Sequence, residues 1–210
     1  MFDLTTIGLF ASASILLAIT PGPDMIYIAT RSIAQGRNAG VVSALGVHTG
    51  VLIHTFAAAL GLSALIAASA VAFSMVKYAG AGYLIYLGIQ TFLSKSEMLE
   101  IKSTARAKLS QVYYQGLLVN LFNPKIILFF LAFLPQFVDP SQGNVKLQLL
   151  ILGILFIVFG LPIAMSVGLA GGQFGIWLRA KQEIQQATKW VTGSVYIIMG
   201  VTTATSSRKA

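Results

Sequence analysis

The chain alternates long apolar stretches free of charge with short segments that carry its charged residues. The charge-free stretches run 4–23, 38–76, 78–94, 109–124, 126–138, 147–178 and 190–207. A membrane-spanning helix needs about 20 mostly apolar residues, and 38–76 is long enough for one helix, a turn near Gly61 and the start of the next. The pattern therefore predicts six membrane-spanning helices, at about residues 4–30, 39–61, 70–93, 112–135, 147–171 and 188–206.

Two of these helices are interrupted by proline next to a charged residue. The first contains Thr20-Pro21-Gly22-Pro23-Asp24 and the fourth contains Asn123-Pro124-Lys125. Proline removes a backbone donor and clashes with the preceding turn, and broken backbone in lipid must be buried by protein or wetted by a cavity. An ionisable residue at that depth is a candidate functional residue by default. The sequence thus predicts helix breaks at Pro21, Gly22, Pro23 and Pro124. The plainer alternative is a proline kink, with Asp24 capping the next half-helix.

The breaks belong to a weak internal repeat. Pro23-Asp24 and Pro124-Lys125 align at an offset of 101 residues, and Lys77 and Gly88 align with Lys189 and Gly200 at an offset of 112. Two three-helix halves follow, and the second starts on the opposite side of the membrane because three is odd. The predicted fold is an all-α integral membrane protein with one domain over 1–210. Its inverted repeats cover about 1–93 and 112–206, joined by a cytoplasmic loop at about 94–111, a recurrent plan of secondary transporters.

Composition and charge support this fold class. Of 210 residues, 56% are hydrophobic and 10% are charged, and mean hydropathy is +0.81; soluble domains carry about 25% charged residues. The net charge of +8 could suggest nucleic acid, but nine basic residues fall in the connections after the first, third and fifth helices and three on the other side. The positive-inside rule predicts a multi-pass plasma-membrane protein with both termini outside the cytoplasm and no nucleic-acid partner. No basic residue precedes Arg31, so no cleaved signal peptide is expected.

Other chemistries find less support. The chain has no cysteine, and therefore no disulfide framework or thiolate. His48 and His54 are six residues apart, about 240° around a helix, so they do not share a face, and interhelical hydrogen bonding is the favoured role. Gly46-x-x-x-Gly50, and Gly168 with Gly171, Gly172 and Gly175, favour close helix packing. A passive channel would need a continuous polar pore, and an enzyme using Asp24 or a histidine would need a nucleophile–base or metal-ligand motif. Few polar residues recur along the predicted helices to line such a pore, and no such motif is present. A passive channel for small polar metabolites is therefore the second hypothesis and a membrane-embedded enzyme the third.

Several short stretches occur in combination: Thr20-Pro21-Gly22-Pro23-Asp24, Gly36-Arg37-Asn38-Ala39-Gly40, Leu45-Gly46 with Gly50, Gly80-Ala81-Gly82-Tyr83-Leu84-Ile85-Tyr86-Leu87-Gly88, Asn123-Pro124-Lys125 and Leu134-Pro135-Gln136-Phe137. The combination spans all six predicted helices and resembles the LysE/RhtB family of amino-acid exporters. The resemblance implies efflux of amino acids or small relatives from the cytoplasm, driven by the proton-motive force. It implies no cofactor, only the proton as coupling ion. The implied partners are an amino-acid substrate and the lipid bilayer, and a homo-oligomer is left open.

A zwitterionic amino acid explains why an aspartate and a lysine flank such breaks. Each charged end loses hydration in a low-dielectric site, so each needs a fixed opposite charge. Asp24 is suited to the ammonium group. Lys125 is suited to the carboxylate, helped by the positive N-terminus of its half-helix. Unwound carbonyls near Thr20 and the Asn123 amide are candidates for the remaining hydrogen bonds.

Two hypotheses follow from the same residues. Asp24 and Lys125 pair with each other in the empty site, and exchange of this pair for substrate, or protonation of Asp24, switches the transporter between its inward- and outward-facing states. Asp24 is the one carboxylate predicted at membrane depth, and a substrate ammonium occupies it. A second cation on the substrate would stay desolvated, so the predicted substrate is neutral or hydroxylated, such as threonine, homoserine or leucine, rather than lysine or arginine.

Overall fold

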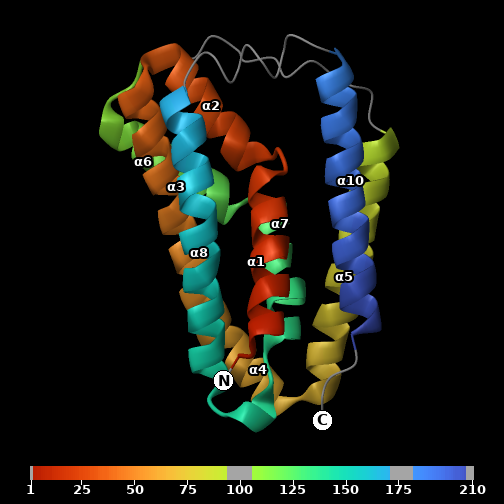
Figure 1. Ribbon diagram of the computed structural model, residues 1–210. Helices are drawn as coiled ribbons and strands as arrows, with labels where there is room; N and C mark the ends of the chain where they lie inside the picture. Colours follow the sequence, from red (N-terminus) through yellow and green to blue (C-terminus); the bar gives the residue numbers. More distant parts are fainter. Residues whose placement is uncertain (1, 94–105, 171–181, 207–210) are drawn as a thin grey trace.

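The computed structural model describes residues 2–93, 106–170 and 182–206, and these residues form helices without any strand (Figure 1). The elements are α1 (Leu4–Ile19), α2 (Pro23–Gln35), α3 (Arg37–Ala57), the π-helical turn η1 (Ala58–Leu62), α4 (Ser63–Ala68), α5 (Ala70–Leu93), α6 (Leu109–Leu121), α7 (Pro124–Leu128), the π-helical turn η2 (Phe129–Phe133), the 3₁₀ turns η3 (Leu134–Phe137) and η4 (Pro140–Gln142), α8 (Val145–Ala170) and α10 (Gln182–Thr205).

Several of these helices are long and apolar enough to cross a membrane. Among the described residues they are Arg37–Ile66, α5 and α8. Two further spans are bent pairs: α1 with α2 at 50°, and α6 with Pro124–Phe137 at 49°. The sixth predicted helix forms as α10 but is not among the candidate spans, because threonines and other polar residues interrupt its apolar pattern. The protein is therefore a multi-pass, all-helical membrane protein.

The turn predicted near Gly61 is wrong. The backbone there continues through η1 into α4, and the chain turns at Ser69, whose backbone is extended (φ −158°, ψ 115°). No proline interrupts this stretch, and a lone glycine weakens a helix without stopping it. The second predicted helix is therefore longer than expected.

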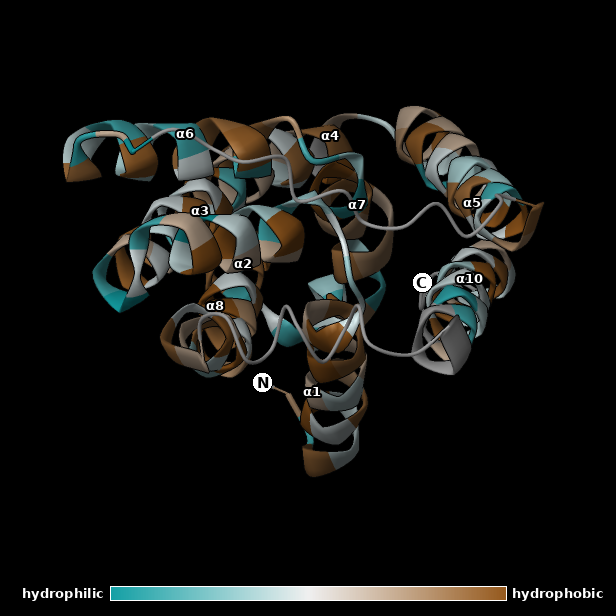
Figure 2. Ribbon diagram, turned by 90° about the horizontal axis from the view of Figure 1, so that it is seen from above, coloured by the Kyte–Doolittle hydropathy of each residue, from teal (hydrophilic) through white to brown (hydrophobic). Residues whose placement is uncertain are grey.

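The helices form two groups with α1 and α7 between them. On one side, α3 packs against α2, α6 and α8; on the other, α5 and α10 pack along each other. Figures 1 and 2 show the α5–α10 pair standing apart from the larger group, while η2 reaches both. Figure 2 shows hydrophobic residues, in brown, on the outward faces of the helices as well as on the inward ones. Large apolar side chains such as Leu4, Leu93 and Phe122 are exposed, as expected of surfaces that meet lipid.

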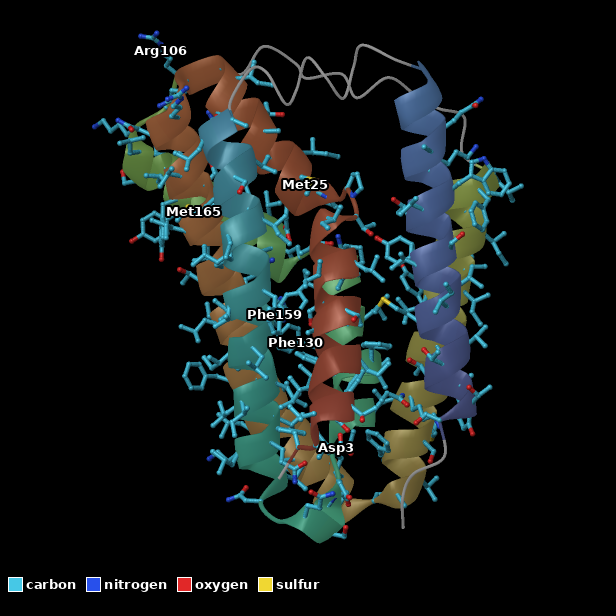
Figure 3. All side chains as sticks on the ribbon, viewed as in Figure 1. Asp3, Met25, Arg106, Phe130, Phe159 and Met165 are labelled. Atoms are coloured by element: carbon cyan, nitrogen blue, oxygen red, sulfur yellow. The ribbon has the colours of Figure 1, made fainter. Side chains whose placement is uncertain are left out.

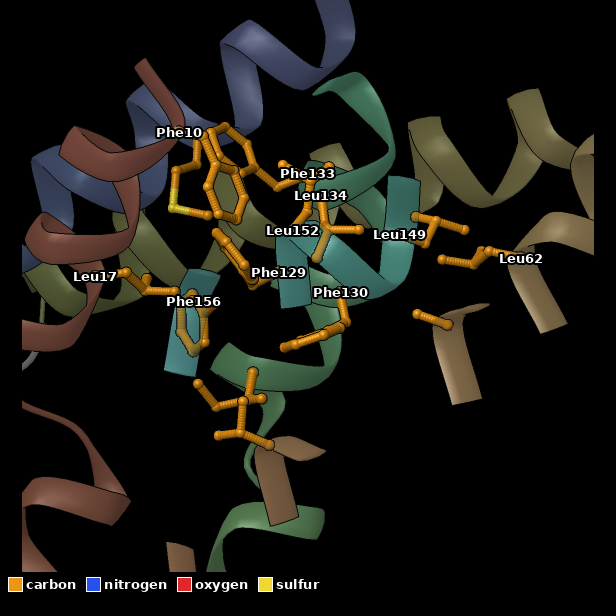
Figure 4. Close-up of a cluster of buried hydrophobic side chains, with 14 of the residues drawn as sticks. Phe10, Leu17, Leu62, Phe129, Phe130, Phe133, Leu134, Leu149, Leu152 and Phe156 are labelled. Atoms are coloured by element: carbon orange, nitrogen blue, oxygen red, sulfur yellow. The ribbon is translucent and has the colours of Figure 1, made fainter. Parts of the chain in front are cut away.

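An aromatic cluster lies where α1, η2 and α8 meet (Figure 4). Phe129 of η2 is fully buried, with its ring centroid 4.6 Å from Phe156, 5.4 Å from Phe133 and 6.0 Å from Phe10. Phe130 packs against the same Phe156 ring at 5.8 Å. These five phenylalanines, from α1, η2 and α8, are called the aromatic cluster below. π-Helical turns are frequent at functional sites, and this one supplies three of the five rings.

Arg31 differs from its predicted place in a cytoplasmic connection. It lies within α2, is 5% exposed, and donates to Gln115 Oε1 of α6 at 2.5 Å while its guanidinium sits 5.7 Å from the Tyr27 ring centroid. Helix α2 continues past Arg31 to Gln35, which moves the connection to Gly36. Residues 94–105 of the loop predicted at about 94–111 lie outside the described residues, as do Gly171, Gly172 and Gly175. The end of that loop is shorter than predicted, because α6 already begins at Leu109.

Candidate functional site

The first predicted break is confirmed. Helix α1 ends at Ile19, Thr20 and Gly22 are extended, and Pro23 begins α2 at its first position. Proline suits that position because its missing N–H would have no intrahelical partner there. The Thr20 N–H and hydroxyl both donate to the Leu16 carbonyl, at 3.0 and 2.6 Å. Pro21, Gly22 and Pro23 therefore separate two half-helices, as the sequence predicts.

The second predicted break has the same construction. Helix α6 ends at Leu121, Asn123 is extended and Pro124 opens α7. The Asn123 Oδ1 accepts from the Lys125 N–H at 3.1 Å, which makes it the N-cap of α7. Its Nδ2 is buried and has no hydrogen-bond partner within the described part of the chain. Asn123 is thus a helix cap whose side chain also acts on the nearby Asp24 carboxylate without making a hydrogen bond of normal geometry to it. It does not line the cavity described below.

The two breaks are joined by reciprocal hydrogen bonds. Lys125, just after the second break, donates from Nζ to the Thr20 carbonyl at 2.7 Å. Asp24, just after the first break, accepts at Oδ2 from the Asn120 amide at 2.8 Å. Each charged residue therefore contacts the polar residue that precedes the other helix's break. Lys125 places its cation at the C-terminal end of α1, and Asp24 lies in the first turn of α2, so each charge also meets the favourable end of a helix dipole.

The hypothesis that Asp24 and Lys125 pair with each other is wrong for this conformation. Their contacts go to Asn120 and Thr20, and no ion pair joins the two within the described residues. An ammonium group has three donors, and one of those on Lys125 is used. The second oxygen of Asp24, Oδ1, is buried without a hydrogen-bond partner. Both charged groups therefore keep hydrogen-bonding capacity that a ligand could use.

A small cavity lies where the broken helices meet. Its polar lining comes from Thr20, Asp24, His48 and Lys125, and its apolar walls come from Leu17, Ala18, Met25, Ile28, Val47, Val51, Ile126, Phe156, Gly160, Ala164 and Val167. Met25, next to Asp24, marks the bend in Figure 3. About 60 Å³ is open to the centre of a water-sized sphere, several times the ~10–15 Å³ that one water needs. Phe156 belongs also to the aromatic cluster, which therefore forms one wall of the cavity.

Two further residues, Asn120 and His48, belong to this region, and neither was predicted from the sequence as part of the substrate site. Asn120, fully buried, holds the Asp24 carboxylate; an asparagine within an apolar helix, three residues before Asn123, was the available signal. His48 lines the cavity, and its Nδ1 lies 2.9 Å from the Ala44 carbonyl of its own helix. The interhelical bond predicted for His48 is therefore wrong.

His54 follows the prediction. Its Nε2 lies 3.4 Å from the Asn120 carbonyl of α6, and its ring stacks on Phe130 at 5.8 Å. This contact is interhelical, and His54 is not among the cavity-lining residues. The two histidines thus occupy different faces of α3, as their spacing predicts. Among the described residues, no group of three or more His, Asp or Glu side chains is placed to hold a metal ion.

Broken helices that enclose a partly polar cavity within an apolar, multi-pass bundle define a class of protein, the membrane transporters. The profile of the LysE type translocator family matches residues 15–207, so the chain belongs to this family. The protein is accordingly a membrane transporter of small molecules, not an enzyme.

Named relatives cover nearly the whole chain. A homoserine/homoserine lactone efflux protein of Salmonella typhimurium is 32% identical over 194 residues, which cover 92% of this chain and 93% of the relative. The uncharacterized membrane protein YrhP of Bacillus subtilis is 32% identical over 210 aligned residues, covering 91% and 94%. The uncharacterized membrane protein PA4757 of Pseudomonas aeruginosa is 29% identical, covering 97% of each chain. No solved structure matches the chain significantly.

Proposed function

We propose that this transporter exports small neutral or hydroxylated amino acids, such as homoserine, threonine or leucine, from the cytoplasm by proton antiport. The observation that carries the proposal is the placement of Asp24 and Lys125 in one cavity, each with unused hydrogen-bonding capacity. The Salmonella relative, which is similar over nearly its full length, is named for efflux of both homoserine and its lactone. Its name supports export of compounds that carry the homoserine ammonium group, whereas the requirement for a free carboxylate rests on Lys125 alone.

The cavity suits the two ends of a zwitterion. The unpaired Oδ1 of Asp24 is the acceptor for a substrate ammonium, and the remaining donors of the cavity-lining Lys125 bind a substrate carboxylate. Both charges already sit in a desolvated site, so a ligand with complementary charges replaces the water that they lack. The apolar wall from Val47, Val51 and Phe156 offers a surface for a small side chain.

The same lining disfavours basic substrates. Among the described residues that line the cavity, Asp24 is the only carboxylate, and the substrate's α-ammonium occupies it. The side-chain cation of lysine or arginine would lie against apolar residues such as Ile28 or Val167 without a counter-charge, at a cost of several kcal/mol, of the order found for unpaired buried charges. Neutral and hydroxylated side chains carry no such cost.

Two inverted halves, residues about 1–93 and 112–206, provide the basis for alternating access in this proposal. Reciprocal packing of α5 on α10 supports them. A Cβ added at Gly88 would meet Ile197 at 2.6 Å, and a Cβ added at Gly200 would meet Ile85 at 2.6 Å. Gly88 and Gly200 are 112 residues apart, and so are Ile85 and Ile197. Each glycine therefore contacts the repeat equivalent of the other's partner, which is the relation expected of a two-fold axis between the halves. With both termini outside the cytoplasm, the two halves would open the cavity to each side in turn.

The proposal is tested by exchange in proteoliposomes. Purified protein is reconstituted with unlabelled homoserine inside, and entry of trace labelled homoserine, threonine, leucine and lysine is followed from outside. We expect the first three, and not lysine, to accumulate transiently above their external concentration, because a carrier exchanges them for the internal pool. A passive channel would only equilibrate the label. Strong preference for lysine over homoserine would contradict the assigned substrate class.

A further inference from the structure

The ring of His48 has a defined protonation pattern in its neutral form. Its Nδ1 lies 2.9 Å from the Ala44 carbonyl oxygen. A carbonyl oxygen only accepts, so this contact requires hydrogen on Nδ1. The second nitrogen, Nε2, then carries a lone pair and no hydrogen. His48 therefore presents a proton acceptor at its Nε2 end.

This acceptor opens onto the cavity. His48 is a lining residue, and its Nε2 is neither hydrogen-bonded to the described protein nor among the buried polar atoms that lack a partner. Gly160 of α8 lies beside this nitrogen, since an added Cβ there would be 3.3 Å from Nε2 and 4.0 Å from the Ala18 Cβ. Because residue 160 has no side chain, none from this position covers Nε2.

The charged groups around the ring set what a proton there would do. Asp24 of α2 and Lys125 of α7 line the same cavity, while α1 and α8 contribute no titratable lining residue. His54, on the same helix, is directed to Asn120 and Phe130, and Tyr113 of α6 bonds Thr49 instead. With Asp24 ionised and Lys125 charged, the cavity groups are neutral in sum. A proton on His48 makes that sum +1.

We propose that His48 Nε2 is the binding site of the coupling proton, in competition with the substrate ammonium that Asp24 holds. The protonated imidazole turns from acceptor to donor and places a like charge in the cavity that receives the ammonium. Substrate release and proton uptake then favour each other, which is what antiport requires. Asp24, whose carboxylate accepts from Asn120, serves the substrate in both steps. This inference rests on the proposed export function.

The test compares His48→Asn with His54→Asn. Asparagine at 48 retains an amide donor for the Ala44 carbonyl and lacks the second nitrogen, while His54 lies off the cavity. Proteoliposomes carry homoserine and a pH difference of one unit, with the membrane potential clamped by potassium and valinomycin. Exchange of one proton per homoserine predicts a final concentration ratio of about tenfold, since one pH unit and a tenfold gradient are equal free energies. We expect this ratio for the wild type and His54→Asn. His48→Asn should exchange homoserine more slowly and reach a ratio of about one.

The outcomes separate the two proposals. A tenfold ratio in His48→Asn overturns the role of His48. Homoserine exchange by the wild type without any pH-driven ratio overturns proton coupling, and His48 with it, but leaves the carrier in place. Absence of exchange by the wild type overturns the proposed function itself.

A second measurement does not depend on an active His48 variant. The chain has two histidines, so His54→Asn protein labelled with ¹⁵N-histidine gives the signal of one ring. We expect the neutral ring to carry hydrogen on Nδ1, to take up a proton at Nε2 as the pH is lowered, and to lose it when homoserine is added. A neutral ring protonated at Nε2, or one unaffected by pH and substrate, overturns the inference.

Discussion

At the scale of single residues, the site depends on polar groups that each make two kinds of contact. Lys125 satisfies the Thr20 carbonyl left free at the end of α1 and still has donors for a ligand. Asn120 fixes one oxygen of Asp24 and leaves the other unpaired. These contacts stabilise the breaks and orient the charges together. Simple loss of transport on substitution would therefore not separate a structural role from a binding role.

The bond between Asn120 and Asp24 predicts a coupling that a double-mutant cycle can measure. Hydrogen bonds to charged groups contribute about 1.5–3 kcal/mol, so Asn120→Ala should lower the free energy of unfolding in mixed micelles by at least that amount. The interaction energy from Asn120→Ala, Asp24→Ala, which removes the acceptor, and the double variant should also fall in this range. Additive effects of the two substitutions would show that the bond at 2.8 Å carries no such energy.

At the scale of elements, proline and glycine define both the breaks and the closest helix contacts. Pro23 and Pro124 each begin a new half-helix. Gly40 of α3 faces Gly168 of α8, whose carbonyl also accepts from the Ser32 hydroxyl at 2.5 Å. Small residues allow such approach in membranes, where packing replaces the hydrophobic effect as the force between helices.

Helix α5 offers a matched pair of glycines for testing this packing. An added Cβ at Gly88 would lie 2.6 Å from Ile197 and 2.9 Å from the Gly193 carbonyl, whereas one at Gly82 would meet nothing within 4 Å. Alanine favours a helix over glycine by about 1 kcal/mol at either position. Gly82→Ala should therefore be neutral or stabilising, while Gly88→Ala should be destabilising, since overpacking costs about 1–3 kcal/mol. Thermal unfolding in detergent provides the comparison. Equal midpoints for both variants would mean that α5 and α10 do not pack as described.

At the scale of the whole molecule, the proposed orientation rests on where the basic residues lie. Asn38 lies in the first turn of α3 and Lys146 in the first turn of α8. These two helices begin at opposite ends of the bundle (Figure 1). Both residues are exposed, and the chain has no native cysteine. With both termini outside, an impermeant thiol reagent added to cells should label Lys146→Cys but reach Asn38→Cys only after the membrane is permeabilised. The reverse pattern would invert the proposed topology.

Much of this architecture could be predicted from the sequence because the strongest sequence signals depend on neighbouring residues along the chain. The breaks at Pro23 and Pro124, the α5 bounds at Ala70 and Leu93, and the separate faces of the two histidines all follow from backbone chemistry or helical spacing. The Gly61 turn failed because glycine alone does not stop an apolar helix.

Side-chain partners were less predictable because they depend on which helices become neighbours. Arg31 was predicted in a connection because charged residues usually lie outside the membrane-spanning helices. In the structure it lies within α2, and Gln115 of α6 accepts its hydrogen bond. The pairing of Asp24 with Lys125 was a hypothesis from opposite charge alone. In the structure the two breaks lie together, and the hydrogen bonds of these residues go to Asn120 and Thr20 instead. The place of His48 on the cavity likewise required α1 and α8 to be positioned.

The central claim, that Asp24 and Lys125 hold opposite ends of a zwitterion, is tested most directly by competition between homoserine and its lactone. The two compounds share the ammonium group, and the lactone lacks a free carboxylate. Inhibition of labelled homoserine exchange is measured for wild type, Lys125→Met and Asp24→Asn. Losing one partner of a buried charge pair costs about 2–5 kcal/mol, at least tenfold in affinity. We expect the wild type to prefer homoserine by at least about tenfold and Lys125→Met to lose that preference. Asp24→Asn should weaken both compounds alike and keep it. A wild type that binds both equally, or a Lys125→Met variant that still prefers homoserine, would contradict the account.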